Sequence, residues 1–81
     1  MDFKPGRVVA ALAGRDKGRF FVITEESERF VFLADGETRK LANAKKKNKK
    51  HVRLTTEQIP LEGLTDSRLR KLLAHHNKPI V

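Results

Sequence analysis

The fold is decided by residues 19–34, RFFVITEESERFVFLA. Two aromatic and β-branched runs, residues 19–24 and 30–34, flank a polar segment, which is the pattern of a β-hairpin. Each run is apolar at successive positions, so we expect both faces of the hairpin to be at least partly covered. The stretch therefore predicts two antiparallel strands with a core on one face and a covering element on the other.

Further strands are predicted on both sides of this hairpin. Residues 7–13, RVVAALA, follow a Pro-Gly turn and end at a glycine, which favours a strand over a helix. Asp35-Gly36 is a two-residue turn signal, so residues 37–41 are expected to fold back as a fourth strand, with a fifth at residues 51–54. Short strands joined by closely spaced turns indicate a small antiparallel barrel, because closure removes exposed edges.

The last third of the chain has the periodicity of one short helix. Thr65 can cap a helix whose apolar side chains follow the i, i+3, i+4, i+7 spacing, namely Leu69, Leu72, Leu73 and His76. We expect this helix to cover the open face of the sheet, Asn77 to end it, and residues 78–81 to form a loose tail. Docking to a second protein is the alternative role for the helix.

The length of 81 residues allows one domain with a compact core. We divide it into a barrel at residues 1–56, with a basic loop at 43–51, and a connector, helix and tail at 57–81. The chain has no cysteine, so it contains no disulfide and no thiolate zinc site. Its apolar runs are too short for a membrane span, and its start lacks the apolar core of a signal peptide, so we expect a cytoplasmic protein without a membrane partner.

The charge of the chain is concentrated in one segment. The sequence has 18 Lys and Arg against 10 Asp and Glu, a net charge of +8. Residues 37–53 hold eight of the basic residues and only one acidic residue, whereas residues 1–36 are neutral overall. Such an excess favours a polyanionic partner, above all a nucleic acid.

A turn with two glycines lies between the first two predicted strands, at residues 14–19, Gly-Arg-Asp-Lys-Gly-Arg. Glycine permits positive φ and close backbone approach, while the basic side chains project from the bend. Asp16 is expected to accept backbone N–H groups of the bend or to pair with a neighbouring arginine. The turn is not a nucleotide P-loop, because Arg19 follows Gly18 where that motif has Lys and then Ser or Thr. An ordinary charged hairpin turn is the alternative interpretation.

The lysine run at residues 45–51, KKKNKKH, has the charge that a phosphate backbone requires. Lysines give non-directional charge, and counterions released from the nucleic acid drive association. A solvated loop or a localisation-type basic patch would have the same composition. Apolar Leu41 and Val52 flank the run, so we expect a loop held at both ends.

The motifs together resemble a known family. Gly6-Arg7-Val8-Val9, the glycine turn at residues 14–19 and the apolar run after it are similar to the KOW motif of ribosomal and transcription-elongation proteins. Residues 30–36, the lysine cluster and Lys50-His51 before Thr55 extend the similarity to the small single-KOW ribosomal proteins of archaeal and eukaryotic large subunits, over about residues 3–56.

This resemblance implies a small SH3-like antiparallel β-barrel. With the short C-terminal helix that the spacing of the leucines predicts, the expected fold class is mainly β. It also implies that the KOW hairpin and the basic loops contact structured RNA, usually ribosomal RNA. The predicted RNA-binding residues are Arg7, Gly14, Arg15, Lys17, Gly18, Arg19, Arg39, Lys40, Lys45, Lys46, Lys47, Lys49, Lys50 and His51.

Aromatic residues give little support for base stacking. The sequence has no Trp or Tyr, and its five Phe lie at Phe3 and in the two strand runs, where we expect them in the core. Recognition of folded RNA by shape and phosphate position is therefore the expected mode. The alternatives are a protein-interaction module, as in transcription or translation factors, and a general nucleic-acid binder.

Nothing in the sequence supports a catalytic site or a metal-binding site. His75 and His76 are adjacent, so on a helix their side chains would point about 100° apart and would not easily share a metal. Glu25, Glu26 and Glu28 lie in a turn, where solvated carboxylates are expected rather than an acid–base pair. We therefore predict a protein that is not an enzyme, with no catalytic residues, metal, cofactor or small-molecule substrate.

Overall fold

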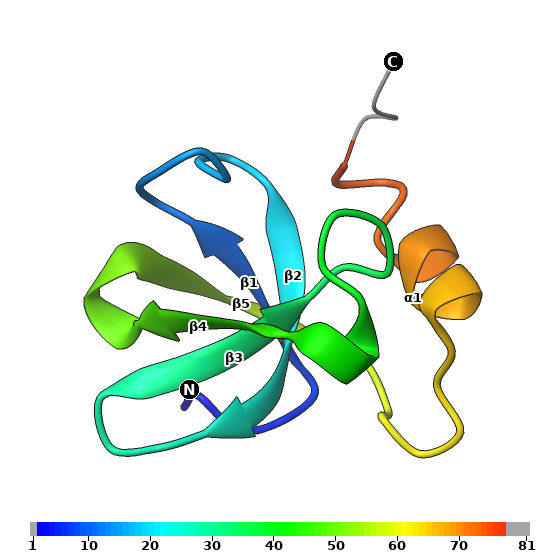
Figure 1. The fold of residues 1–81 in the computed structure, drawn as a ribbon, viewed down its shortest axis with the longest axis horizontal. Coiled ribbons are helices and arrows are strands. Elements are labelled where there is room, and N and C mark those ends of the chain that lie inside the picture. The colour runs from blue at the N-terminus through cyan, green and yellow to red at the C-terminus, as the bar shows by residue number, and fades with distance from the viewer. Residues whose placement is uncertain (1, 78–81) are drawn as a thin grey trace.

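The structure, a computed structural model, describes residues 2–77. It contains five strands, two 3-10 turns and one α-helix, arranged as Figure 1 shows. The elements are β1 (Arg7–Ala11), β2 (Phe20–Glu26), β3 (Phe30–Ala34), η1 (Leu41–Asn43), β4 (Lys45–Asn48), η2 (Lys49–His51), β5 (Val52–Gln58) and α1 (Asp66–Leu72). The predicted loose tail at residues 78–81 lies outside the described residues.

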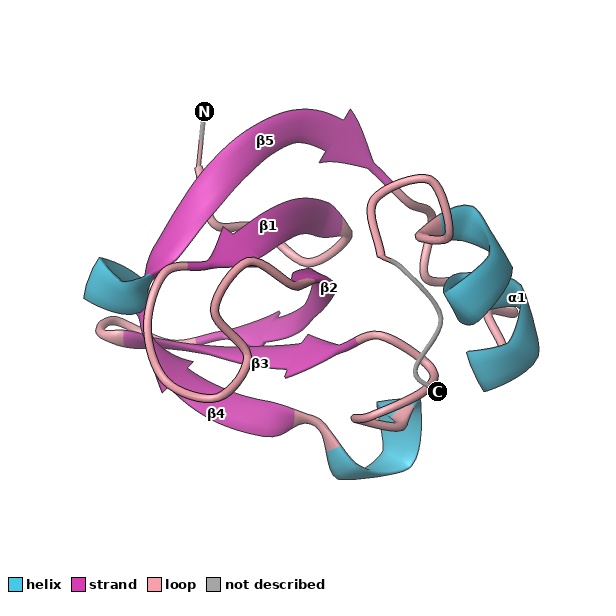
Figure 2. Ribbon diagram, turned by 90° about the horizontal axis from the view of Figure 1, so that it is seen from above, coloured by secondary structure: helices cyan, strands magenta, loops and turns pink. Residues whose placement is uncertain are grey.

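The five strands form one antiparallel sheet with the order β4-β3-β2-β1-β5. β4 and β5 are the two edges, yet only η2 separates them in the chain. Strands lie about 4.8 Å apart, so the edges of a flat five-strand sheet would be about 19 Å apart. A 3-10 turn advances about 2 Å per residue. The sheet must therefore curl strongly, as Figure 2 shows, although in the described part of the chain β4 and β5 do not pair.

Both faces of the sheet are buried, which confirms the prediction from residues 19–34. Side chains alternate across the strands, so neighbours in β1 and β2 enter different clusters. The inner face of the curl holds Val9, Ala11, Phe21, Ile23, Val31, Leu33 and Val52. The opposite face holds Val8, Val22, Ala34 and Ile59 together with Leu69 and Leu73 of the C-terminal segment.

The helix α1 covers this second face as predicted. Thr65 has extended backbone, and its side chain accepts a hydrogen bond from the Arg68 N–H, so it caps the helix. Leu69 and Leu73 are fully buried against the sheet. The prediction that Asn77 ends the helix is wrong, because α1 ends at Leu72. The Asn77 side chain instead pairs with both backbone groups of Phe20, at 2.8 Å to its N and 2.9 Å to its O, so the end of the segment is fixed to β2.

The prediction of a strand at residues 37–41 is wrong, because the side chain of Asp35 organises a longer loop. One carboxylate oxygen accepts the backbone N–H groups of Glu37 and Arg39, at 2.9 and 2.8 Å. Gly36 has a φ of 77°, and a Cβ there would lie 2.2 Å from the Asp66 carbonyl oxygen. The loop therefore packs against α1, and η1 follows it in place of a strand.

The prediction of a basic loop at residues 43–51 is also wrong, because most of the lysine run is strand β4 followed by η2. β4 pairs with β3 in a register that places Asn48 opposite Phe30 and Lys45 opposite Leu33. Lysine suits an edge strand, where its charge prevents pairing with another chain. The predicted fifth strand at 51–54 exists but runs further, from Val52 to Gln58.

The phenylalanines differ from the prediction of core burial. Only Phe21 is fully buried, and the other four are half-buried.

Among the described residues, no helix has the length and apolar character needed to cross a membrane.

Candidate nucleic-acid interface

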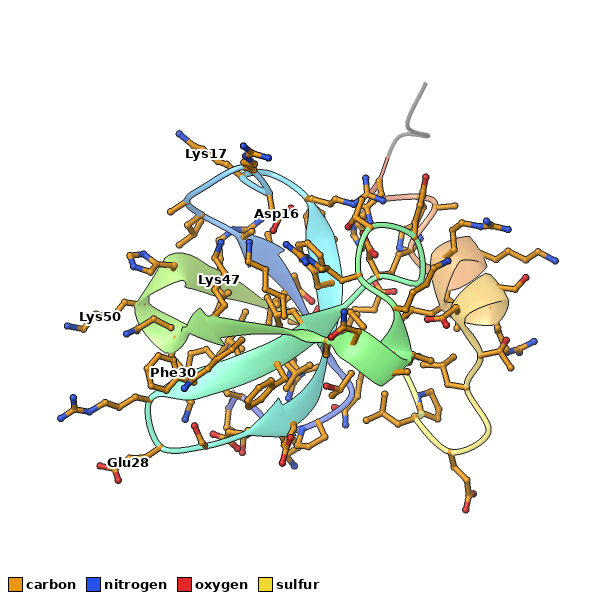
Figure 3. The ribbon with its side chains drawn as sticks, in the orientation of Figure 1. Asp16, Lys17, Glu28, Phe30, Lys47 and Lys50 are labelled. Carbon is orange, nitrogen blue, oxygen red and sulfur yellow. The ribbon has the colours of Figure 1, made fainter. Side chains whose placement is uncertain are left out.

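The turn between β1 and β2 is built from two overlapping bends. The Lys17 N–H donates to the Gly14 carbonyl at 3.2 Å, and the Arg19 N–H donates to the Asp16 carbonyl at 2.8 Å. Gly14 and Gly18 have φ values of 78° and 87°, which confirms that the turn uses the left-handed region favoured by glycine. Arg15 and Lys17 are left exposed at the tip, and Figure 3 shows Lys17 pointing away from the protein.

Two lysines of β4 tie this turn to the edge of the sheet. The ammonium of Lys45 pairs with Asp16 at 3.0 Å, and that of Lys47 donates to the Ala13 carbonyl at 2.8 Å. Asp16 therefore pairs with a lysine of another element and not with an arginine of its own turn. Figure 3 shows Asp16 and Lys47 in the space between the turn and β4. The two predicted basic elements thus lie side by side on one surface, which we call the basic face: residues 14–18, β4 and η2.

The other lysines of the basic face have separate environments. Lys46 is exposed, and its ammonium lies 4.3 Å from the centre of the Phe30 ring, a cation–π contact between diagonal neighbours on β4 and β3. Lys49 pairs with Glu26 at 2.7 Å. Lys50 is exposed at η2, where Asn48 caps the turn by accepting the Lys50 N–H at 2.9 Å.

His51 is exposed at the end of η2, and its carbonyl accepts the Leu12 N–H at 2.8 Å. In Figure 1 the β1–β2 turn and the β4–β5 connection lie on the side of the sheet away from α1. Lys50 and Lys17 both project outward on that side in Figure 3. The basic face is therefore separate from the surface of the helix.

One residue of this region was missed by the sequence reasoning. Arg29 lies in the β2–β3 turn, and its carbonyl accepts the Lys49 N–H at 3.0 Å. Together with Glu28, Asn48, Lys49 and Lys50 it lines a surface hollow next to η2. The pairing of β3 with β4 brings Arg29 here, and no sequence pattern indicates that pairing.

Four predicted RNA-binding residues lie elsewhere. The Arg19 guanidinium forms ion pairs with Asp35 and Glu37, and its side chain is only 15% exposed. Arg7 donates to the carbonyls of Thr55 and Thr56 and pairs with Asp2. These two arginines connect parts of the fold rather than face outward.

Arg39 and Lys40 belong to the loop that Asp35 organises, beside α1. The Lys40 ammonium reaches the Gly36 carbonyl at 3.4 Å, and the Arg39 carbonyl accepts the N–H groups of both Asp35 and Gly36. The structure therefore does not bring Arg39 and Lys40 into the basic face.

A second polar cluster joins β5 to the segment after α1. Nε2 of His76 lies 2.8 Å, and Nε2 of His75 3.2 Å, from the same carboxylate oxygen of Glu57. Burial raises the pKa of Glu57, but the hydrogen bonds with His76 and His75 outweigh it and hold the pKa below its ordinary value. The prediction that the side chains of His75 and His76 point apart on a helix is wrong, because α1 ends at Leu72 and both residues lie in a turn.

A scan of the chain against models of known protein families gives no match, and no curated protein sequence matches it.

Proposed function

We propose that the protein binds folded RNA through the basic face, as a ribosomal or ribosome-associated protein. The observation that carries this proposal is the junction of the glycine turn with β4, through Lys45 with Asp16 and Lys47 with Ala13. Two basic segments that are about 30 residues apart in the sequence are thereby brought side by side. Such a surface suits phosphates arranged in three dimensions, as in folded RNA.

The ion pairs within the protein separate the basic residues into two groups with different roles. Lys45 and Lys49 are paired with carboxylates and so fix the positions of the turn and of η2. The side chains that remain exposed for phosphates are those of Arg15, Lys17, Lys46 and Lys50. Each phosphate that they neutralise contributes about −0.7 to −0.9 to the slope of log affinity against log salt.

The proposal includes an SH3-like barrel of the KOW type. The strong curl of the sheet supports it, as does the position of the glycine turn directly between β1 and β2, where the resemblance places the KOW motif. In this proposal the protein acts by binding and not by catalysis, and it works in the cytoplasm.

Binding measurements with three nucleic acids would test the function. The protein is titrated with ribosomal RNA, with an unstructured RNA of equal length and with duplex DNA, each over a salt series. We expect the tightest binding to ribosomal RNA and a slope of about −3 to −4, from four contacts at the value given per phosphate. Equal affinity for all three would reduce the protein to a general polyanion binder, and a salt-independent affinity would contradict the electrostatic mechanism.

Co-sedimentation with ribosomal particles at low salt would test the partner. We expect the protein in the particle fraction, and its release after RNase treatment. Partners that persist after RNase would instead favour a protein-interaction module, and partners lost only after DNase would favour a nucleoid-type binder.

A further inference from the structure

The cluster at Glu57, His75 and His76 has the composition of a transition-metal site. It offers two imidazole nitrogens and one carboxylate oxygen, and these ligand atoms all lie within 4.8 Å of one another. Imidazole with carboxylate suits Zn²⁺ and its first-row neighbours, whereas Mg²⁺ and Ca²⁺ prefer ligand sets made of oxygen alone. We propose that these three residues bind one Zn²⁺ ion, with a water molecule as the fourth ligand.

The two distances from the Glu57 oxygen to the histidine nitrogens are close to those that a zinc ion would require. Zn–N and Zn–O bonds of about 2.0–2.1 Å in a tetrahedral site place the ligand atoms about 3.3 Å apart. The Glu57 oxygen already lies 3.2 Å from Nε2 of His75 and 2.8 Å from Nε2 of His76. Small side-chain rotations are therefore enough to move from the hydrogen-bonded arrangement to a coordinated one.

The backbone of the two histidines is held in place before any ion binds. The N–H groups of His76 and Asn77 both donate to the Leu73 carbonyl at 2.9 Å, which closes a turn directly after the helix. This turn breaks the helical progression, so adjacent side chains reach the same carboxylate. The two imidazole rings lie 4.0 Å apart, tilted by 40°.

Phe20 and Asn77 fix the turn against the sheet. The ring of His76 stacks on that of Phe20, with centroids 4.1 Å apart and an interplanar angle of 12°. The Asn77 amide pairs with the Phe20 backbone on both its N and O. The ligands therefore do not have to be assembled by the ion, which lowers the entropic cost of binding it.

The exposure of the cluster fits a site with one open position. The side chains of His75, His76 and Glu57 are 57%, 24% and 34% exposed, so an ion can enter from solvent. Three protein ligands leave a fourth position for water. Because Glu57 lies in β5 and the histidines follow α1, the ion would also link the sheet to the C-terminal segment.

Zinc titration of the full chain tests the proposal. Isothermal calorimetry with Zn²⁺ should show one equivalent bound, and Co²⁺ should give the visible absorption of a four-coordinate site with nitrogen and oxygen ligands. Mg²⁺ should not bind, and Zn²⁺ should raise the melting temperature because it binds only the folded state. A wild-type protein that takes up no Zn²⁺ at micromolar concentration overturns the proposal.

Single variants identify the ligands. Loss of an outer-shell partner alone lowers metal affinity by about 10–100-fold, so Glu57→Gln and His75→Ala should each lower zinc affinity by at least about tenfold. His75 is the most exposed of the three, so His75→Ala removes a ligand without removing a core contact. The matched control is His51→Ala on η2, the remaining histidine of the chain, which should keep wild-type zinc affinity.

Two outcomes of the variant series would overturn the assignment. Either Glu57→Gln and His75→Ala bind zinc as tightly as the wild type, or His51→Ala weakens binding as much as they do. Far-UV circular dichroism of each variant confirms that it is folded before its affinity is compared.

Discussion

At the scale of single residues, Asp35 has the largest influence on the path of the chain. Its side chain is fully buried and accepts hydrogen bonds from the backbone of Glu37 and Arg39, from the Thr38 hydroxyl and from Arg19. These bonds hold the loop after β3 in a shape that no two-residue turn could take.

Asp35 also gives the protein a defined acid sensitivity. Burial raises the pKa of Asp35, but hydrogen bonds from Thr38, Arg39, Arg19 and Glu37 outweigh it, so the pKa lies below its ordinary value. The folded state therefore holds this proton more weakly than the unfolded state. The stability from the carboxylate is complete above the ordinary pKa, and it is lost as the pH falls through the lower folded value.

We expect Asp35→Asn to lower the free energy of unfolding at pH 7 by about 3 kcal/mol, because it leaves Arg19 with one carboxylate in a largely buried position. Urea unfolding at pH 7 and at acid pH measures this, and the difference from the wild type should shrink in acid. The control is Glu26→Gln, which breaks a more exposed pair with Lys49 worth about 0–1 kcal/mol. An equal decrease in the free energy of unfolding in the two variants would contradict the role of Asp35.

The sequence showed that Asp35-Gly36 ends a strand but not how the chain continues. The pattern is that of a hairpin turn, and the residues that override it, Arg19 and Asp66, are distant in sequence. The glycine turn at 14–19 was predictable because its conformation depends on its own two glycines.

At the scale of elements, β4 and the glycine turn carry the exposed charge of the basic face in different ways. Lys46 and Lys50 are flexible point charges, whereas Arg15 presents a planar guanidinium that can make two directed hydrogen bonds. The first pair should therefore contribute affinity for any RNA, and the turn should contribute selectivity.

Three double variants with the same change in charge separate these roles. Lys46→Gln with Lys50→Gln should weaken binding to every RNA and make the salt slope shallower by about 1 to 2. Arg15→Gln with Lys17→Gln should narrow the difference between the affinity for ribosomal RNA and the affinity for competitor RNA. Arg68→Gln with Lys71→Gln, on the exposed surface of α1, is the control and should change RNA binding least. Identical behaviour of the first two would mean that the turn supplies only additional charge.

The elements were predictable where their own residues determine them. Aromatic and β-branched runs predicted β2 and β3, and the Thr65 cap with the leucine spacing predicted α1. β4 was not predictable, because Lys-Lys-Lys-Asn has low strand propensity. It becomes a strand because β3 offers an unpaired edge and because Lys45 and Lys47 find partners in the turn.

At the scale of the whole molecule, α1 completes the core by covering the second face of the sheet. Leu69 is fully buried there with Val8 and Val22. A sheet that is apolar on both faces needs this cover to be stable in water. The helix lies on the side of the sheet away from the basic face, so we expect it to contribute to stability rather than to RNA contact (Figure 1).

We expect Leu69→Ala to lower the free energy of unfolding by about 2–5 kcal/mol, because it removes a large side chain from a packed core. The control is Leu12→Ala, a leucine that is 46% exposed, which should cost about 0.5 kcal/mol or less. Urea unfolding compares the two, and RNA affinity should be unchanged for Leu69→Ala under conditions where it is folded. If Leu69→Ala is as mild as Leu12→Ala, the helix does not complete the core.

The composition of the candidate site was largely visible in the sequence, but its assembly was not. The exposed cations of the turn and of β4 were among the predicted residues, whereas their junction depends on contacts between distant segments. The grouping of Glu57 with His75 and His76 was missed because helical spacing was extended past Leu72, where the helix ends.

The pairing of β1 with β5 has a consequence for the order in which the protein is made and folded. Ala11 pairs with Val52 and Arg7 with Gln58. One edge of β1, which is made early, therefore stays unpaired until β5 has been made. At about 5–20 residues per second, translation takes several seconds to supply the missing partner. During that time β1 can pair only with β2, and β3 can add to the other edge of β2, whereas β4 and η2 are made directly before β5. The basic face and the second edge of β1 are therefore completed almost together, once residues 45–58 have been made.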